Sequence, residues 1–320
     1  LRELGGNAAI AGRAFEQAAN ALEAATIKGP PNDREQAFQF FVTATAYHLA
    51  GYSARAYSVL AAMHGVENFS PLERALSYLI TRELERLDIY AYEILQSGAG
   101  QDAAITAYFA DRFNGQDGDD GYDEGETLLE GVDAALTELF FRAIATVLLA
   151  FERGDRQLLE SARELLRQGA RACEELNLIP QWWAFKLGYH LVADLWDSSF
   201  HERLPRAPAG GEAADWPGLR DVFIASLYRR RKAEIDLWPS QRDVAARAVD
   251  QADDLVVSLP TSAGKTRIAE LCILRTLAAS RRVVFVTPLR ALSAQTETGL
   301  QRTFGPLGKT ISALYGSAGI

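Results

Sequence analysis

The segment 259–266, Leu-Pro-Thr-Ser-Ala-Gly-Lys-Thr, constrains the fold of this chain more than any other feature. It follows an apolar run at 255–259 that predicts a short buried strand, and it precedes a stretch that predicts a helix. A loop that curls from a strand into a helix N-terminus directs several backbone N–H groups at one point, which suits a polyphosphate. Gly264 would let the backbone approach closely, Lys265 would reach the β- and γ-phosphates, and the Thr266 hydroxyl would ligate Mg²⁺.

The residues after this loop repeat the same pattern of strand and helix. Segments 283–287 and 310–314 predict two further strands, and 291–303 predicts the helix between them. Strand, helix and strand at this spacing predict a right-handed parallel unit. Residues 216–320 therefore predict an α/β domain with a parallel sheet, and we expect it to be incomplete because three strands would leave an apolar sheet edge uncovered.

The residues before this domain predict helix after helix. Apolar side chains between Leu128 and Phe151 recur at steps of three and four, as on the packed face of a helix. Ser70-Pro71-Leu72-Glu73 has the pattern of a capping box with proline at the first helical position. We expect an all-helical domain over 1–215, with 205–211 as a linker or long surface loop.

Composition indicates a soluble protein in a reducing compartment. The chain has 320 residues, 48% hydrophobic and 23% charged, which suits two globular domains. Its two cysteines, Cys173 and Cys272, lie far apart, which excludes a disulfide framework and a cysteine zinc site. The apolar run at 143–151 is about half the ~20 residues that a membrane span needs. We expect a cytoplasmic protein with no membrane partner.

Charge is distributed unevenly along the chain. The formal net charge is −9, yet the residues from Asp221 onward carry 14 basic and 9 acidic side chains, a net of +5, and the preceding ones a net of −14. The basic excess therefore lies in the same part of the chain as the phosphate loop, where it suits a nucleic-acid partner. Within it, the run 229–232, Arg-Arg-Arg-Lys, is expected to be a solvated face, with guidance of nucleic acid as the alternative.

Three motifs resemble those of the superfamily 2 helicases. The loop Pro-Thr-Ser-Ala-Gly-Lys-Thr at 260–266 is most similar to the DExH group that includes the superkiller-type RNA helicases, although Leu259 replaces the first glycine of the general phosphate-loop pattern. The segment 237–241, Leu-Trp-Pro-Ser-Gln, ends 24 residues before the loop's lysine and resembles the family's adenine-reading glutamine motif. Segment 287–292, Thr-Pro-Leu-Arg-Ala-Leu, resembles the first nucleic-acid motif, and 315–319 resembles the next backbone-binding segment more loosely.

The resemblance implies a RecA-like motor lobe of an ATP-dependent nucleic-acid helicase, which uses ATP and Mg²⁺ and holds single-stranded DNA or RNA by its backbone. The implied cofactor-binding residues are Gln241, Thr261, Ser262, Ala263, Gly264, Lys265 and Thr266. Among them, Lys265 and Thr266 are the implied catalytic residues, and Thr266 is the implied metal ligand. The implied nucleic-acid-binding residues are Pro288, Arg290, Gly316 and Ser317.

The resemblance covers about a quarter of the chain, and within it no Asp-Glu-x-His motif and no second motor lobe follow. Since the chain also begins with Leu1, we expect it to be the N-terminal portion of a longer protein. ATP turnover is then expected of that protein and not of this portion alone.

Two other hypotheses stay open. The helical domain is an interaction scaffold that docks an effector or masks the motor's groove, or the chain is a P-loop ATPase that is not a helicase. The motifs around Gln241 and Arg290 together argue against the second. Large bacterial helicases with helical N-terminal extensions also occur in anti-phage systems with a partner nuclease, so the resemblance extends to bacterial defence and to an effector-nuclease partner.

Overall fold

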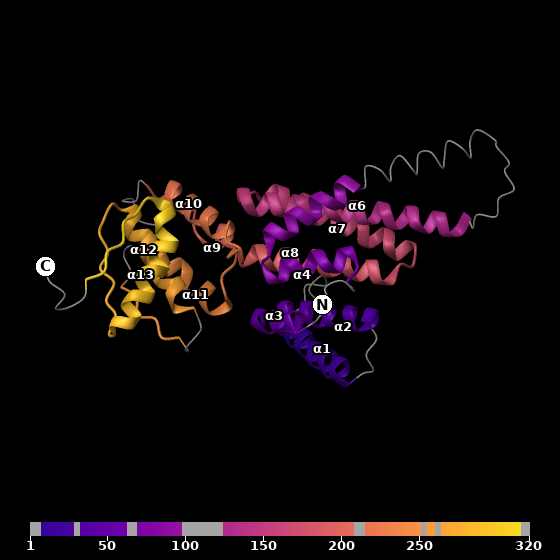
Figure 1. Ribbon diagram of the computed structural model, residues 1–320, viewed down its shortest axis with the longest axis horizontal. Coiled ribbons are helices and arrows are strands. Elements are labelled where there is room, and N and C mark those ends of the chain that lie inside the picture. The colour runs from indigo at the N-terminus through magenta and orange to yellow at the C-terminus, as the bar shows by residue number, and fades with distance from the viewer. Residues whose placement is uncertain are drawn as a thin grey trace. The chain divides into compact units, whose positions relative to one another are not determined.

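The computed structural model of the chain falls into two compact units, Leu1–Asp194 and Leu195–Ile320, which we call the N-terminal and the C-terminal unit (Figure 1). The expected domain boundary between 215 and 216 stays a prediction. The residues that the structure describes are 8–28, 33–62, 69–97, 124–207, 215–250, 254–259 and 264–314.

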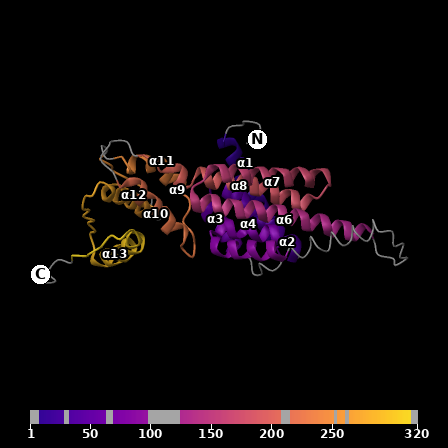
Figure 2. The same cartoon turned by 90° about the horizontal axis from the view of Figure 1, so that it is seen from above.

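The regular secondary structure of the N-terminal unit is entirely helical among its described residues, and helices such as α1 and α2 or α6 and α7, which follow one another in sequence, pack together (Figures 1 and 2). Residues 84–97 are also helical. The last helix, α8, continues three residues into the C-terminal unit. The labelled helices are α1 (Ala8–Lys28), α2 (Asp33–Leu49), α3 (Ser53–Ala61), α4 (Pro71–Thr81), α6 (Glu124–Arg153), α7 (Arg156–Glu175) and α8 (Ile179–Asp197).

The capping box predicted at the start of α4 is confirmed. The Ser70 hydroxyl accepts a hydrogen bond from the backbone N–H of Glu73 at 3.4 Å. In return the Glu73 carboxylate accepts one from the backbone N–H of Ser70 at 3.1 Å, and Pro71 occupies the first helical position. Two backbone donors that a helix start would leave without partners are thereby satisfied.

A close approach of α7 to α8 forms the centre of the N-terminal core. A Cβ atom built on Gly169 of α7 would lie 2.1 Å from the Phe185 ring of α8, so only glycine fits there. The Phe185 ring in turn meets Phe140 of α6 edge to face, with ring centroids 5.2 Å apart. Helices α6, α7 and α8 are therefore closely packed around the ring pair of Phe140 and Phe185.

One stretch of the described residues, Gly131–Arg153 of α6, is long and apolar enough to span a membrane by length and composition alone. Half of its most apolar window is buried inside the protein, and α6 packs against both α4 and α7. A helix buried in the core of a soluble domain passes the same test, because its apolar side chains serve packing. The expectation of no membrane partner stays a prediction.

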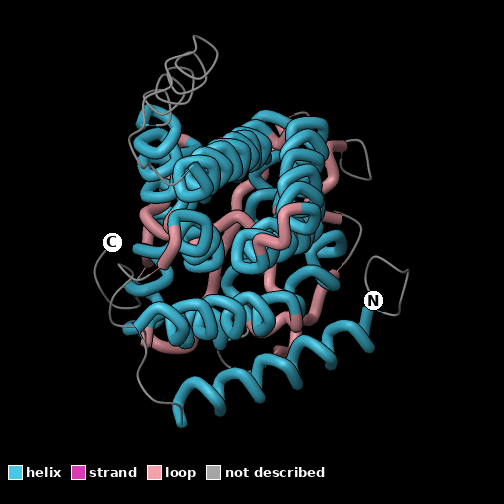
Figure 3. The backbone as a smooth tube through the Cα atoms, turned by 90° about the vertical axis from the view of Figure 1, so that its right-hand side faces the viewer, coloured by secondary structure: helices cyan, strands magenta, loops and turns pink. Residues whose placement is uncertain are grey.

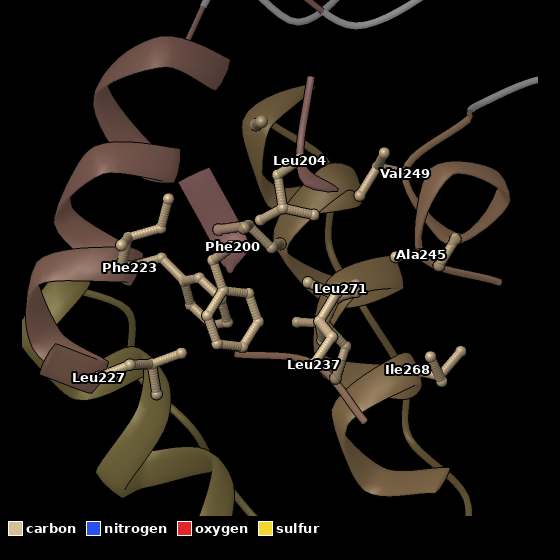
Figure 4. Close-up of a cluster of buried hydrophobic side chains, with 14 of the residues drawn as sticks. Phe200, Leu204, Phe223, Leu227, Leu237, Ala245, Val249, Ile268 and Leu271 are labelled. Carbon is tan, nitrogen blue, oxygen red and sulfur yellow. The ribbon is translucent and has the colours of Figure 1, made fainter. Parts of the chain in front are cut away.

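The C-terminal unit surrounds a core of its own (Figure 4). The rings of Phe200 and Phe223 meet edge to face at its centre, with centroids 6.0 Å apart, and Leu271 of α12 lies beside them. Its elements are α9 (Phe200–Arg203), α10 (Trp216–Tyr228), α11 (Pro239–Ala248), α12 (Lys265–Ala278), α13 (Arg290–Phe304) and the 3₁₀ helix η2 (Gly305–Leu307).

The predicted parallel sheet is not confirmed. No strand is assigned anywhere in the described residues, which Figure 3 draws only as helices and loops. Segments 254–259, 281–287 and 309–314 lack regular structure, because no ladder of backbone hydrogen bonds joins them. The one β-bridge of the described chain lies elsewhere, between Ser199 and Asp236.

These three segments keep the side-chain alternation of strands. Leu255, Val257 and Ile311 pack against the core of the C-terminal unit, whereas their alternate neighbours point away from it. That outward set is almost fully exposed, with exposed fractions of 95% for Val256, 87% for Val284, 83% for Val286 and 97% for Leu314. Val283 and Phe285 are still 38% and 43% exposed, so one face of the predicted sheet is partly covered and the other is bare among the described residues.

Candidate nucleotide-binding site

The described part of the phosphate loop requires glycine at position 264 for two reasons. Gly264 has φ 77° and ψ 32°, in the left-handed region that side chains disfavour. A Cβ atom there would also lie 1.9 Å from Nε2 of Gln241. The chain thus turns sharply into α12 at the residue where the motif predicts a close backbone approach.

Lys265 and Thr266 are the first two residues of α12, and both are exposed. Neither side chain has a hydrogen bond or an ion pair with any described residue, so both can meet a ligand. The start of a helix also presents unpaired backbone N–H groups and a partial positive charge. A left-handed glycine, a helix N-terminus, a lysine and a hydroxyl fit the phosphates of a nucleotide with its Mg²⁺. Thr261, Ser262 and Ala263 lie outside the described residues.

Gln241 lies against the phosphate loop, where it contacts Gly264, 23 residues later in the chain. Its side chain is 5% exposed, and its Nε2 donates a hydrogen bond to the carbonyl oxygen of Gly264 at 3.1 Å. Its Oε1 accepts one from the backbone N–H of Trp238 at 2.9 Å, which caps the start of α11. The amide thereby ties α11 to the phosphate loop, and only its second N–H and second lone pair are left for an adenine edge.

The predicted nucleic-acid motif forms the entry to α13. The Thr287 and Ser293 hydroxyls share a hydrogen bond, and the backbone N–H of Ser293 donates to the Leu289 carbonyl at 3.0 Å, which fixes the turn. Pro288 and Arg290 are exposed at the start of this helix, as a backbone-binding turn requires. Gly316 and Ser317 lie outside the described residues.

A cavity of about 400 Å³ lies between α12 and the segments 254–259 and 281–287. Lys265 is one of the residues that line this cavity, but the lining is mainly apolar, with Val257, Ile268, Cys272 and Phe285 among the residues. Apolar walls do not suit phosphate. This cavity therefore does not suit the phosphates of a nucleotide.

Five residues next to the site were not singled out from the sequence. They form a cluster of four charged groups and one hydroxyl, in which only the Glu234 side chain, at 37%, is substantially exposed. Its members are Arg230, Glu234, Arg267, Glu270 and Thr303. The expectation that the run 229–232 is a solvated face is wrong for Arg230, whose side chain is 10% exposed. The spacings Arg230 to Glu234 and Arg267 to Glu270 are those of helical ion pairs, a signal that cannot distinguish an exposed pair from a buried one.

Both cysteines are free thiols. Burial, the larger cause, and the nearby Asp133 charge raise the pKa of Cys173 to about 11. Burial also raises the pKa of Cys272. Among the described residues no group of three histidine, cysteine, aspartate or glutamate side chains is arranged to hold a metal ion.

Residues 238–320 match the model of the DEAD/DEAH box helicase family. This segment is therefore similar to that family. It includes the turn at Gly264 and the motif at the start of α13, and we call it the helicase segment. The resemblance to superfamily 2 DExH helicases is thereby confirmed.

Two curated relatives of this chain are themselves helicases. The chain is 45% identical over 88 residues to the chloroplastic DExH-box ATP-dependent RNA helicase DExH15 of Arabidopsis thaliana, which covers 28% of this chain and 7% of that protein. It is 34% identical over 106 residues to the exosome RNA helicase MTR4 of Homo sapiens, covering 33% of this chain and 8% of that protein.

A third relative also resembles the helical region. The chain is 27% identical over 196 residues to the Hachiman protein HamB of Bacillus cereus, which covers 60% of this chain and 17% of that protein. Because the helicase segment makes up only about a quarter of the chain, most of this likeness lies before it. The chain spans no more than 17% of the length of each of these three relatives.

Proposed function

We propose that the protein is an ATP-dependent, nucleic-acid-stimulated helicase or translocase of the DExH type. This chain supplies its helical N-terminal domain, residues 1–215, and the first nucleotide- and strand-binding segments of its RecA-like motor. The observation that carries the proposal is the left-handed Gly264 at the start of α12, with Lys265 and Thr266 exposed beside it and Gln241 bonded to its carbonyl.

Each residue of the site has a defined role in this proposal. Bound MgATP supplies the phosphoanhydride bond whose hydrolysis drives movement along a strand. The Lys265 ammonium neutralises charge on the β- and γ-phosphates, and the Thr266 hydroxyl is the ligand for Mg²⁺. Gln241 orients the loop by holding the Gly264 carbonyl and reads adenine with its remaining hydrogen-bonding capacity.

The proposed strand partner is single-stranded DNA or RNA. Pro288 and Arg290 at the start of α13, together with Gly316 and Ser317, would hold its phosphates, so that binding does not depend on base sequence. The proposal includes a parallel sheet of 255–259, 283–287 and 310–314, whose carboxyl ends would lead into these binding segments. The alternation of covered and bare side chains along these segments supports it.

Lys265→Ala in the full-length protein tests the proposal. The expected result is a loss of strand-stimulated ATP hydrolysis by at least about a hundredfold, since a positioned charge at a developing phosphate charge contributes several kcal/mol. Lys309→Ala is the matched control, because it removes another lysine of the same unit that lies outside the phosphate loop. Undiminished turnover of Lys265→Ala would refute the assignment.

A second candidate function is a protein-interaction scaffold built on the helical region, in a cytoplasmic bacterial defence system with an effector nuclease as partner. The likeness to Hachiman protein HamB, which extends well before the helicase segment, favours it. Lys265→Ala separates the two candidates in cells. A scaffold keeps its protection against phage when the phosphate loop is disabled, whereas a motor loses it.

A further inference from the structure

A closed ring of largely buried polar contacts includes Arg267, whose backbone N–H donates to the Gly264 carbonyl of the phosphate-binding turn at 3.0 Å. Arg267 donates to the Glu234 carboxylate through Nη2, and its Nη1 lies 2.5 Å from Oε2 of Glu270 in an ion pair. The Thr303 hydroxyl donates to Oε1 of Glu270 at 2.8 Å. Arg230 closes the ring by donating to Glu234 and, at 3.1 Å, to the Thr303 hydroxyl. We call these five residues the charge ring.

The charge ring is balanced in charge and buried on all sides but one, since only the Glu234 side chain, 37% exposed, reaches solvent. Two guanidinium groups face two carboxylates, which gives a formal charge of zero. Glu270 is 5% exposed and Thr303 is 2% exposed. The Arg267 guanidinium also lies over the Phe200 and Phe223 rings, 5.6 and 5.9 Å from their centroids. A buried charge must keep its partners, because separating them leaves it without compensation.

Burial lowers the pKa values of both arginines of the ring. Desolvation, the largest cause, lowers the pKa of Arg267 from its usual value, and the Glu270 carboxylate opposes that change. Desolvation likewise lowers the pKa of Arg230, again against the attraction of Glu270. Glu270 thus compensates both guanidinium groups, and any change in its position alters the contacts of Arg267.

The ring connects the two proposed binding segments. Arg267 follows Thr266 directly on α12, so it sits one residue from the proposed Mg²⁺ ligand. Thr303 lies near the end of α13, the helix that begins at Arg290 in the proposed nucleic-acid motif. An α-helix of this length is a stiff rod about 22 Å long, so a displacement at its first turn moves its last turn as well.

We propose that the charge ring couples strand binding to ATP hydrolysis. A strand that binds at the start of α13 displaces that helix. The Thr303 hydroxyl then moves Glu270, to which it is hydrogen-bonded. The movement of Glu270 changes the position of Arg267 and of the phosphate-binding turn next to it. Thr303 and Glu270 are positioning residues in this account and touch neither ATP nor nucleic acid. The inference rests on the proposed function, since it assigns the regulation of that same site.

Thr303→Val tests the coupling in the full-length protein, because it removes the hydroxyl and keeps the shape of the side chain. The readouts are the basal ATPase rate, the rate at saturating poly(U) or poly(dT), KM for ATP and thermal stability. We expect the ratio of stimulated to basal rate to fall at least about fivefold, the lower end of typical coupling effects, while the basal rate changes less than twofold. Thr303→Ser restores the hydroxyl and is expected to restore the ratio.

Thr298→Val is the matched control. Thr298 lies exposed on the same helix, and its hydroxyl donates only to the Ala294 carbonyl one turn earlier. We expect it to leave the ratio unchanged. Glu270→Gln is a second test that keeps the acceptor for Thr303 but removes the charge facing Arg267, and the same fall in ratio is expected.

Three outcomes overturn the coupling. One is a ratio within twofold of wild type in both Thr303→Val and Glu270→Gln. Another is a parallel fall of basal and stimulated rates, which indicates a merely structural role. The third is a wild-type protein without strand-stimulated ATPase, which refutes the proposed function itself before any variant is compared.

Discussion

The N-terminal and the C-terminal unit use apolar side chains in opposite ways. In the N-terminal unit, helices satisfy their own backbone and bury their apolar faces on one another, as where Gly169 meets Phe185. In the C-terminal unit, the irregular segments pack Leu255, Val257 and Ile311 against the core, while Val256, Val284 and Leu314 stay exposed. A helix can complete its hydrogen bonds alone, whereas a strand depends on neighbours for both its hydrogen bonds and its faces.

The two units also use charge differently. In the N-terminal unit, the ion pair of Arg167 with Glu164 lies on an exposed helix surface. In the C-terminal unit, Arg267 and Glu270 are buried inside the charge ring. Exposed pairs contribute little to stability, but a buried pair is costly to break. The comparison therefore predicts where substitutions matter most.

The largest expected effect is that of Glu270→Ala. Removing this carboxylate leaves Arg267 and Arg230 facing Glu234 alone, so we expect the free energy of unfolding of the C-terminal unit to fall by about 3 kcal/mol. Glu164→Ala in the N-terminal unit is the control and is expected to cost less than about 1 kcal/mol. Urea unfolding of both variants measures the difference, and equal small effects would contradict the contrast between the units.

The next effect tests the packing of the N-terminal unit. Gly169→Val places a side chain on the Phe185 ring, and overpacking of this kind is expected to cost about 1–3 kcal/mol. Gly131→Ala in α6 is the control, because a Cβ atom there meets nothing within 4 Å. It should instead stabilise its helix by about 0.5–1 kcal/mol. Thermal unfolding checks both signs, and a neutral Gly169→Val would show that α7 and α8 are not in contact.

The same substitution in both units sharpens the comparison. Val147 of α6 is completely buried, and Val284 is 87% exposed. Val147→Thr is expected to cost about 1–2 kcal/mol because it buries a hydroxyl, and Val284→Thr less than about 0.5 kcal/mol. Denaturant titration measures both. A cost above about 1 kcal/mol for Val284→Thr would show that the bare face is covered in solution.

The smallest effect concerns the Cys173 thiol. Its pKa of about 11 means that the reactive thiolate is scarce at pH 8 and increases tenfold with each pH unit until pH approaches 11. The rate of labelling by a thiol reagent in the native protein is expected to rise through pH 10. A rate that levels off near pH 8.5, where ordinary thiols titrate, would contradict the burial of this side chain.

The sequence predicted local features better than pairings between segments. The capping box at Ser70 depends on four consecutive residues, so its pattern was sufficient. The helix predicted at 291–303 is observed at Arg290–Phe304 for the same reason. The sheet depends on partners that alternation does not name, and its strands are not formed in the described residues.

In the candidate site, too, local features were predicted better than contacts between residues far apart in the sequence. The turn at Gly264 followed from one short motif, whereas the contact of Gln241 with the Gly264 carbonyl joins residues 23 positions apart. The charge ring was missed because Arg230 and Thr303 lie 73 positions apart, and nothing in the run 229–232 marks one arginine as buried.

The most direct test of the phosphate site is a binding measurement. Calorimetry compares the affinity of the wild type and of Gly264→Val for a non-hydrolysable ATP analogue with Mg²⁺. Gly264 has a positive φ, and any Cβ atom there meets Gln241, so we expect at least about a tenfold loss of affinity. Gly308→Asn is the control, since Gly308 also has a positive φ but open space around it. Equal affinity in the wild type and Gly264→Val, or no binding by the wild type, would contradict a nucleotide site at this turn.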